Sequence, residues 1–193
     1  MGTAARGRAF AVGLATACAI AVAGCSADPD DQPTDATPAS PTPTDDQTEP
    51  PANQVTEPTL PADAEGGSIR SAKAFVGYYI DLLNYASFTG DTKAFDRLAS
   101  PACGLCADYS DLFHSIWDDG GFLRSSGMTI ERLGVTHADS RTTALSLVVR
   151  VAPTRLKESS TDEPSLAPAK RLFFAIEVGH EPASWRVLRF ETT

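Results

Sequence analysis

The sequence predicts an α+β domain with three N-terminal helices packed on a four-stranded antiparallel sheet. Two observations predict it. Between residues 68 and 117 the apolar residues recur at steps of three and four, the period of helices with one buried face. From residue 128 to the end the period falls to two, which is typical of half-buried strands. Short polar turns join most of these strands, which favours antiparallel pairing and helices on one face of the sheet.

The first helix has clear signals at both ends. Ser68 suits an N-cap, and Gly90 suits the left-handed position that ends a helix. Between them runs an apolar stripe of helical period. Its members are Ile69, Ala72, Phe75, Val76, Tyr79, Ile80, Leu83 and Ala86.

Two shorter helices follow. Asp91 is expected to cap the second helix, which ends before Pro101. The third is expected over residues 105–117 and is ended by the Asp-Asp-Gly-Gly run at 118–121.

The strands of the expected sheet come next. They cover residues 128–137, 142–151, 170–178 and 185–191. Residues 122–124 add a short strand before them, and residues 153–168 are expected to form a polar loop.

The N-terminus predicts export. Arg6 and Arg8 precede about fifteen apolar residues, fewer than the roughly 20 of a membrane-spanning helix, so residues 1–24 have the layout of a signal peptide. The Val-Ala-Gly-Cys run that ends at Cys25 resembles the bacterial lipobox. That resemblance implies acylation of Cys25 with a palmitate-type lipid and cleavage before it. The protein is then a lipoprotein held on the extracytoplasmic face of the cell membrane.

Residues 26–65 differ in composition from the rest of the chain. Pro, Thr, Asp and Glu dominate, with ten acidic and no basic side chains. Such a segment cannot bury enough apolar surface to fold, so residues 25–65 are expected to be the lipidated cysteine and a disordered linker. Residues 66–193 form one domain with fourteen basic and fifteen acidic side chains. No basic stripe is present, so nucleic acid is not an expected partner.

Cys103 and Cys106 are the two cysteines left after lipidation and cleavage. In an exported domain such a pair predicts a disulfide. A thiol–disulfide exchange site at the start of the third helix is an alternative. A zinc site needs four ligands, and the three histidines are scattered, so neither metal nor cofactor is predicted.

Four segments resemble a known family. They are FVGYYIDLLNYASFTGDT, CGLC, WDDGG and the final WRV strand. Over residues 68–191 they are similar to a family of actinobacterial lipoproteins that carries a domain-of-unknown-function label. The resemblance implies a nuclear-transport-factor-2-like (SnoaL-like) fold, in which a curved sheet wraps a long helix into a cone with a pocket. This fold hosts isomerases, dehydratases, binding modules and dimerisation domains, so it does not fix the function.

On such a fold, polar and aromatic groups of the first helix and of one strand are the candidates to line the pocket. They are Tyr78, Tyr79, Asp81, Tyr85, Glu131 and His137. No nucleophile-elbow, zinc-protease or phosphate-loop motif occurs, so no catalytic residue is predicted.

The sequence therefore favours a non-catalytic module that binds a small apolar ligand or an envelope protein. An isomerase- or dehydratase-type enzyme is the first alternative, and thiol exchange through Cys103 and Cys106 is the second. A homodimer through the open face of the sheet is left open.

Overall fold

A computed structural model of the chain describes residues 55–182 and 184–193. The helical elements are the 3-10 turn η2 (Ala62–Ala64), α1 (Ile69–Thr89), α2 (Lys93–Leu98) and α3 (Gly104–Asp118). The strands are β1 (Gly120–Arg124), β2 (Met128–Ala138), β3 (Thr142–Val151), β4 (Thr154–Ser159), β5 (Ser165–Ala167), β6 (Lys170–Glu181) and β7 (Ser184–Thr192). The expected signal peptide, the lipidation of Cys25 and most of the linker lie outside the described residues.

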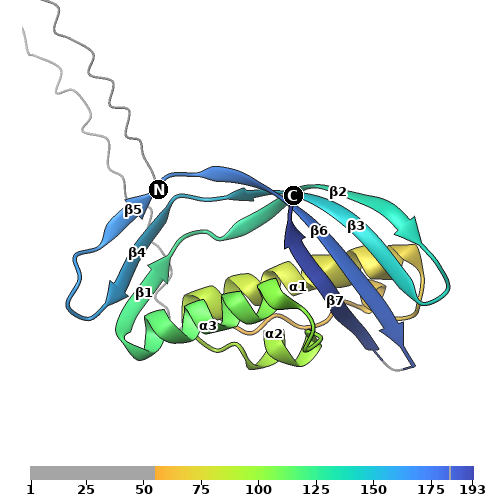
Figure 1. Cartoon of the computed structure of the whole chain (residues 1–193), viewed down its shortest axis with the longest axis horizontal. Coiled ribbons are helices and arrows are strands. Elements are labelled where there is room, and N and C mark those ends of the chain that lie inside the picture. Colours follow the sequence, from red (N-terminus) through yellow and green to blue (C-terminus); the bar gives the residue numbers. More distant parts are fainter. Residues whose placement is uncertain (1–54, 183) are drawn as a thin grey trace, which may run out of the picture. The chain divides into compact units, whose positions relative to one another are not determined.

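The strands form two antiparallel sheets. The expected four-stranded sheet has the order β2-β3-β6-β7, and a second sheet has the order β1-β4-β5. Figure 1 shows the strands arching over the three helices. The expectation of a single sheet with a polar loop at 153–168 is therefore wrong. Both β4 and β5 lie in that loop and are held by backbone pairing with little burial, so they carry no apolar alternation.

The core lies between the helices and the inner face of the four-stranded sheet. Strands β3 and β6 alternate buried and more exposed positions, which confirms the predicted period of two. Helix α1 supplies the largest share of the helical core. Side chains with at most 1% exposure include Phe75, Val76, Tyr79, Leu82, Leu83, Leu145, Leu147, Val149, Phe174, Ile176, Val178, Val187 and Phe190.

The ends of α1 are those the sequence predicts. The Ser68 hydroxyl accepts a hydrogen bond from the Ser71 amide at 3.1 Å, and Gly90 adopts a left-handed φ of 75°. Helix α2 begins one residue later than expected. Thr92 holds its N-cap position, and Asp91 Oδ1 accepts the amide N–H of Lys93 at 3.2 Å.

The domain begins before residue 66, the predicted boundary. Ala64 is 1% exposed, and its carbonyl accepts a hydrogen bond from Trp185 Nε1 at 3.0 Å. The Glu65 carbonyl accepts one from the Ser71 hydroxyl at 2.7 Å. Small residues and backbone carbonyls make these contacts, so hydrophobicity could not reveal them. The last residues assigned to the linker are part of the domain.

The stretch NYASFTGDT of the resemblance has a structural role. Trp117 Nε1 donates to the Ser87 carbonyl at 3.2 Å. A Cβ on Gly90 would lie 2.6 Å from Trp117 Cγ, so only glycine lets the indole pack there. The Thr89 hydroxyl donates to the Tyr85 carbonyl at 2.8 Å. This segment therefore joins the end of α1 to the end of α3.

The β2–β3 turn is held by the Asp139 carboxylate. It accepts the amide N–H groups of Arg141 and Thr142 at 2.7 and 2.8 Å, and also the Thr142 hydroxyl at 3.1 Å. These backbone bonds favour the ionised form and hold the pKa of Asp139 below its ordinary value of 3.8.

We expect the turn to loosen in acid. Because the folded-state pKa is the lower one, this group stabilises the fold above its unfolded pKa. That contribution is lost as the pH falls through the folded pKa. A carbon-13 NMR titration of the Asp139 carboxyl should give a midpoint below 3.8. A midpoint at or above that value would contradict the turn geometry.

Candidate functional site

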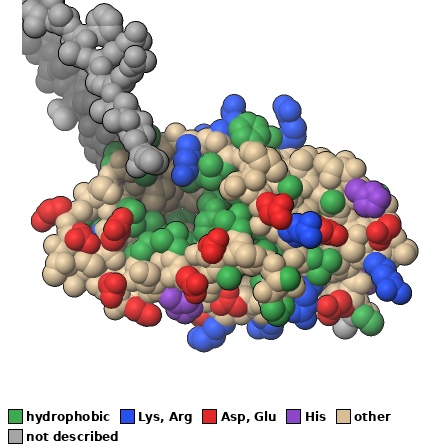
Figure 2. Space-filling model, viewed as in Figure 1, with side chains coloured by type: hydrophobic (Ala, Val, Ile, Leu, Met, Phe, Trp, Pro, Cys, Tyr) green, Lys and Arg blue, Asp and Glu red, His purple; other side chains and the backbone are tan. Residues whose placement is uncertain are grey.

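A pocket of about 240 Å³ opens where α1 and α3 meet the ends of both sheets. Figure 2 shows hydrophobic side chains gathered in a hollow on this face. Its apolar lining consists of Leu83, Phe88, Tyr109, Leu112, Phe113, Leu123, Met128, Val151, Leu156 and Leu172, with Ala167 and Pro168.

Helices form one side of this pocket. Leu83 and Phe88 come from the last two turns of α1, and Leu112 and Phe113 come from α3. Residues three and four positions apart lie on one face of a helix, so Leu83 and Phe88 join with Asn84 and Ser87 into a continuous patch on α1. Leu112 is 48% exposed, which places it where the pocket meets solvent.

The two sheets form the other sides. Met128 of β2 pairs with Val151 of β3, and Val151 pairs with Lys170 of β6, so these three residues lie side by side in one row. The second sheet contributes the directly paired Leu123 and Leu156. The unexpected sheet is therefore a wall of the pocket.

Asn84 fixes the corner between α1 and β2. Its Oδ1 accepts the Met128 amide N–H at 2.7 Å, and its Nδ2 donates to the Met128 carbonyl at 3.0 Å. A Cβ on Gly127, whose φ is 84°, would lie 2.7 Å from Asn84 Oδ1. The amide of Asn84 is thus used by the backbone, although the residue lines the pocket.

The chemistry of the lining suits binding of an apolar group. Its ionisable side chains are Tyr109 and Lys170, and it contains no Asp, Glu or His. Burial raises the pKa of Tyr109, so its hydroxyl stays protonated at neutral pH. Proton abstraction needs a general base within hydrogen-bond reach, and the lining supplies no carboxylate or imidazole.

None of the six residues predicted to line a pocket lines this one. Tyr79 is fully buried and Tyr78 is 8% exposed, so both belong to the core. Asp81 is exposed on α1, and Tyr85 is half-buried. All four therefore lie outside the patch that α1 presents to the pocket, which Leu83, Asn84, Ser87 and Phe88 form.

The two predicted strand residues lie on the outer side of β2. Glu131 pairs with Arg171 at 2.6 Å between Oε2 and Nε. His137 Nε2 lies 3.9 Å from an Asp139 carboxylate oxygen and is exposed. Neither is directed at the helices. The residues that sequence reasoning missed are mostly apolar, and an apolar lining has the same sequence pattern as a core.

Tyr79 carries an unusual buried hydroxyl. Its ring lies 4.7 Å from that of Phe95, and its oxygen is the one buried side-chain polar atom without a hydrogen-bond partner among the described residues. Burial, and then the Asp96 carboxylate, raise its pKa.

Tyr79→Phe is therefore expected to raise the free energy of unfolding by about 1 kcal/mol, because it removes an unsatisfied buried group and keeps the ring. Urea denaturation measures this change. A loss of stability would show that the hydroxyl has a partner in solution.

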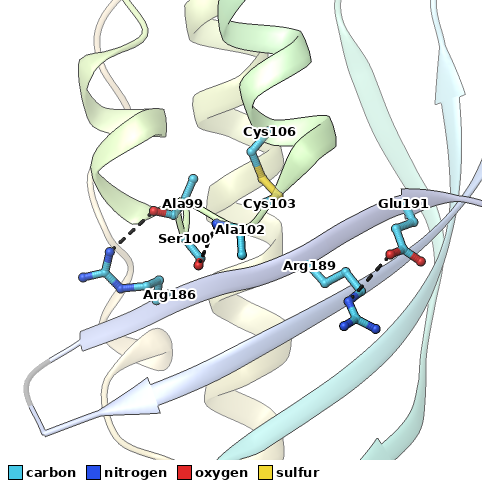
Figure 3. Close-up of a disulfide and its surroundings, with 8 residues drawn as sticks. All are labelled: Ala99, Ser100, Ala102, Cys103, Cys106, Arg186, Arg189 and Glu191. Atoms are coloured by element: carbon cyan, nitrogen blue, oxygen red, sulfur yellow. Dashed lines mark hydrogen bonds and ion pairs between the residues drawn. A yellow bond between two sulfur atoms is a disulfide. The ribbon is translucent and has the colours of Figure 1, made fainter.

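Cys103 and Cys106 form a disulfide at the start of α3, with their Cα atoms 5.3 Å apart (Figure 3). Each residue is only 2% exposed. Thiol exchange requires a thiolate to reach one of the sulfurs, so this burial counts against an exchange site. The neighbouring turn is held by the Ser100 hydroxyl, which accepts the Ala102 amide N–H at 3.2 Å.

A polar cluster links α2 to α3. The Thr92 hydroxyl donates to Asp96 Oδ2 at 2.6 Å, and the Ser110 hydroxyl donates to the same oxygen at 3.1 Å. The Thr92 hydroxyl has one proton, which goes to Asp96, so His114 Nε2, at 3.0 Å, must donate its own proton to the Thr92 oxygen. The serine proton goes to a carboxylate and not to the histidine, so the cluster is not a nucleophile–base pair.

Among residues 55–182 and 184–193, no group of three or more His, Cys, Asp or Glu side chains is placed to hold a metal ion. No helix in these residues combines the length and the apolar character needed to cross a membrane.

Solved structures show a similar fold. The intermembrane space region of the chloroplast protein ARC6 aligns with a TM-score of 0.51 at 10% identity, over 66% of this chain and 97% of that one. A protein of cystatin-like fold from Caulobacter vibrioides gives 0.46 at 9% identity, over 66% and 89%. A provisionally assigned polyketide cyclase from Xanthomonas campestris gives 0.36 at 14%, over 63% and 87%. Of these three, only the first reaches 0.5, and at its identity it shows the fold alone.

The sequence itself identifies the family. No curated protein matches it. The pattern of one family, described as a family of unknown function (DUF6318), matches residues 44–190, which is most of the chain and nearly all of the described domain. The chain therefore belongs to the family of unknown function DUF6318.

Proposed function

We propose that this protein is a binding module that holds a small apolar ligand in the pocket between α1, α3 and the two sheets. The observation that carries the proposal is the lining, which is mostly apolar and contains no Asp, Glu or His. Pockets of this kind bind through burial of apolar surface, with a few polar groups setting orientation. The pocket beneath arching strands is also what a nuclear-transport-factor-2-like cone would present.

We propose further that the domain works on the extracytoplasmic face of a membrane. The support is the apolar run that ends in Val-Ala-Gly-Cys at Cys25, followed by an acidic, proline-rich linker. Labelled palmitate should enter the wild-type chain and not a Cys25→Ser chain. Equal incorporation into the two chains, or incorporation into neither, would contradict the proposed lipid anchor at Cys25. A homodimer through the outer face of the four-stranded sheet, where Phe173 is 50% exposed, stays a prediction.

A pair of exposed leucines tests the pocket. Leu112 lines it, whereas Leu166 of β5 is 69% exposed and lies outside the lining. In the full chain carrying Cys25→Ser, the neutral dye Nile red should bind and gain fluorescence. Leu112→Trp should weaken that binding at least about tenfold, because the indole occupies the opening and keeps part of the dye out of the pocket. A tenfold loss corresponds to about 1.4 kcal/mol, which is less than the burial of one apolar side chain contributes. Leu166→Trp should leave it unchanged.

Two outcomes would contradict the proposal. Equal effects of Leu112→Trp and Leu166→Trp would place the dye elsewhere. Turnover of a carbonyl or hydroxy substrate that disappears with Tyr109→Phe would make the protein an enzyme, because Tyr109 carries the one phenol hydroxyl in the lining.

A further inference from the structure

One charged residue interrupts the inner face of β6. On that face Leu172, Phe174, Ile176 and Val178 follow one another at every second position and are buried or half-buried. Lys170 occupies the next inward position along the same row. Lys170 is the first residue of β6 and is exposed, so a charged side chain meets water at the end of an otherwise apolar row.

Lys170 lies at the edge of the pocket. It is opposite Val151 in the pairing of β3 with β6, and all of Lys170, Val151 and Leu172 belong to the lining. Strand β7 pairs with β6 only from Phe174 onwards, so one flank of Lys170 is free of strand pairing. Its aliphatic stem can cover the apolar lining while its ammonium group reaches water.

The positive charge at this edge forms no ion pair within the part of the chain that the structure describes. Among the ion pairs of the described residues, none involves Lys170, and the lining contains no Asp or Glu. An apolar pocket with one free cation at its edge is complementary to a molecule with an apolar body and one anionic end.

We infer that the ligand is a single-chain anionic amphiphile, with its chain in the pocket and its carboxylate beside the Lys170 ammonium. This inference rests on the proposed function and adds the class of ligand. The volume of about 240 Å³ lies below the roughly 300–1,000 Å³ typical of ligand pockets, which suits one short chain and not a two-chain lipid.

Decanoate and decan-1-ol provide matched probes, because they share a chain and differ in head-group charge. Their affinities are measured by displacement of Nile red from the full chain carrying Cys25→Ser. Lys170→Met keeps the aliphatic stem and removes the charge. It should weaken decanoate binding about fivefold, the size of a partly exposed ion pair, and leave decan-1-ol binding unchanged. Added salt should weaken decanoate binding to the wild-type pocket and not to the Lys170→Met pocket.

Two further variants separate charge from folding. Lys170→Arg keeps the charge and should keep the preference for decanoate. Lys157→Met removes a lysine of β4 that lies outside the lining and should change neither affinity. Unfolding curves show whether each variant is folded. If Lys170→Met does not fold, the Lys170→Arg variant and the salt titration of the wild-type chain still test the inference.

The outcomes distinguish the inference from the proposed function. Both probes can bind while Lys170→Met and salt change the two affinities equally, or change neither. In that case the lysine only protects the free flank of β6, and the inference of an anionic head group is wrong. If neither probe binds the wild-type chain, the apolar pocket itself is not a binding site, and both proposals are overturned.

Discussion

Gly121→Ala is expected to lower the free energy of unfolding by about 3 kcal/mol and to displace the three-stranded sheet. A Cβ at this buried position of β1 would overlap the Lys157 carbonyl oxygen and lie 2.6 Å from that of Glu158. Both are backbone atoms of β4, the strand that pairs with β1, so no side-chain rotation can relieve the contact. Urea denaturation measures the loss.

Gly77→Ala is the matched control for this substitution. Gly77 lies within α1, and a Cβ there meets nothing within 4 Å. Because alanine has a higher helix propensity than glycine, this change should stabilise the domain by about 0.5–1 kcal/mol. Because Leu123 and Leu156 of the displaced sheet line the pocket, Gly121→Ala should also weaken Nile red binding, and Gly77→Ala should not. Similar stabilities for the two variants would refute the close approach of β1 and β4.

Asn84→Leu is expected to cost about 3 kcal/mol of unfolding free energy. The substitution keeps the size of the side chain but removes both hydrogen bonds to the Met128 backbone. The Met128 N–H and C=O then lose their partner on α1, at about 1–3 kcal/mol for each group left unsatisfied. Denaturation curves followed by circular dichroism give the change.

Ser87→Ala serves as the control on the same helix and in the same lining. The Ser87 hydroxyl donates only to the Asn84 carbonyl of its own helix, at 2.7 Å, so its loss should cost less than about 1 kcal/mol. Asn84→Asp keeps the acceptor and loses the donor, and should fall between the two. A stability of Asn84→Leu close to that of Ser87→Ala would mean that the link between α1 and β2 is dispensable.

The elements with a buried face were predictable. The stripe of α1 and the alternation of β3 and β6 are both visible in the sequence, because a buried face demands apolar residues at the period of the element. The caps at Ser68 and Gly90 were predictable from the residue type alone. A serine can accept an amide N–H at the start of a helix, and a glycine can adopt the left-handed φ that ends one. No residue of β4 or β5 is fully buried, so no hydrophobic period marked these strands.

The sequence predicted that a pocket for an apolar ligand exists, but not which residues line it. Polar and aromatic residues such as Tyr79 and Glu131 were the natural candidates, yet they belong to the core and to the outer side of β2. Leu83 and Phe88 line the pocket instead, and nothing in the sequence separates them from core residues. Lys170 carried a usable signal, because it breaks the apolar inward row of β6.

The central claim is that ligands occupy the pocket beside Met128, and an isotope-filtered nuclear Overhauser experiment tests it most directly. With unlabelled decanoate bound to a chain labelled at its methyl groups, contacts should appear from the alkyl chain to the methyls of Met128, Leu123 and Leu172, which line the pocket. Contacts confined to the methyls of Val148, which is paired with the exposed Phe173 on the outer side of the sheet, would contradict the account.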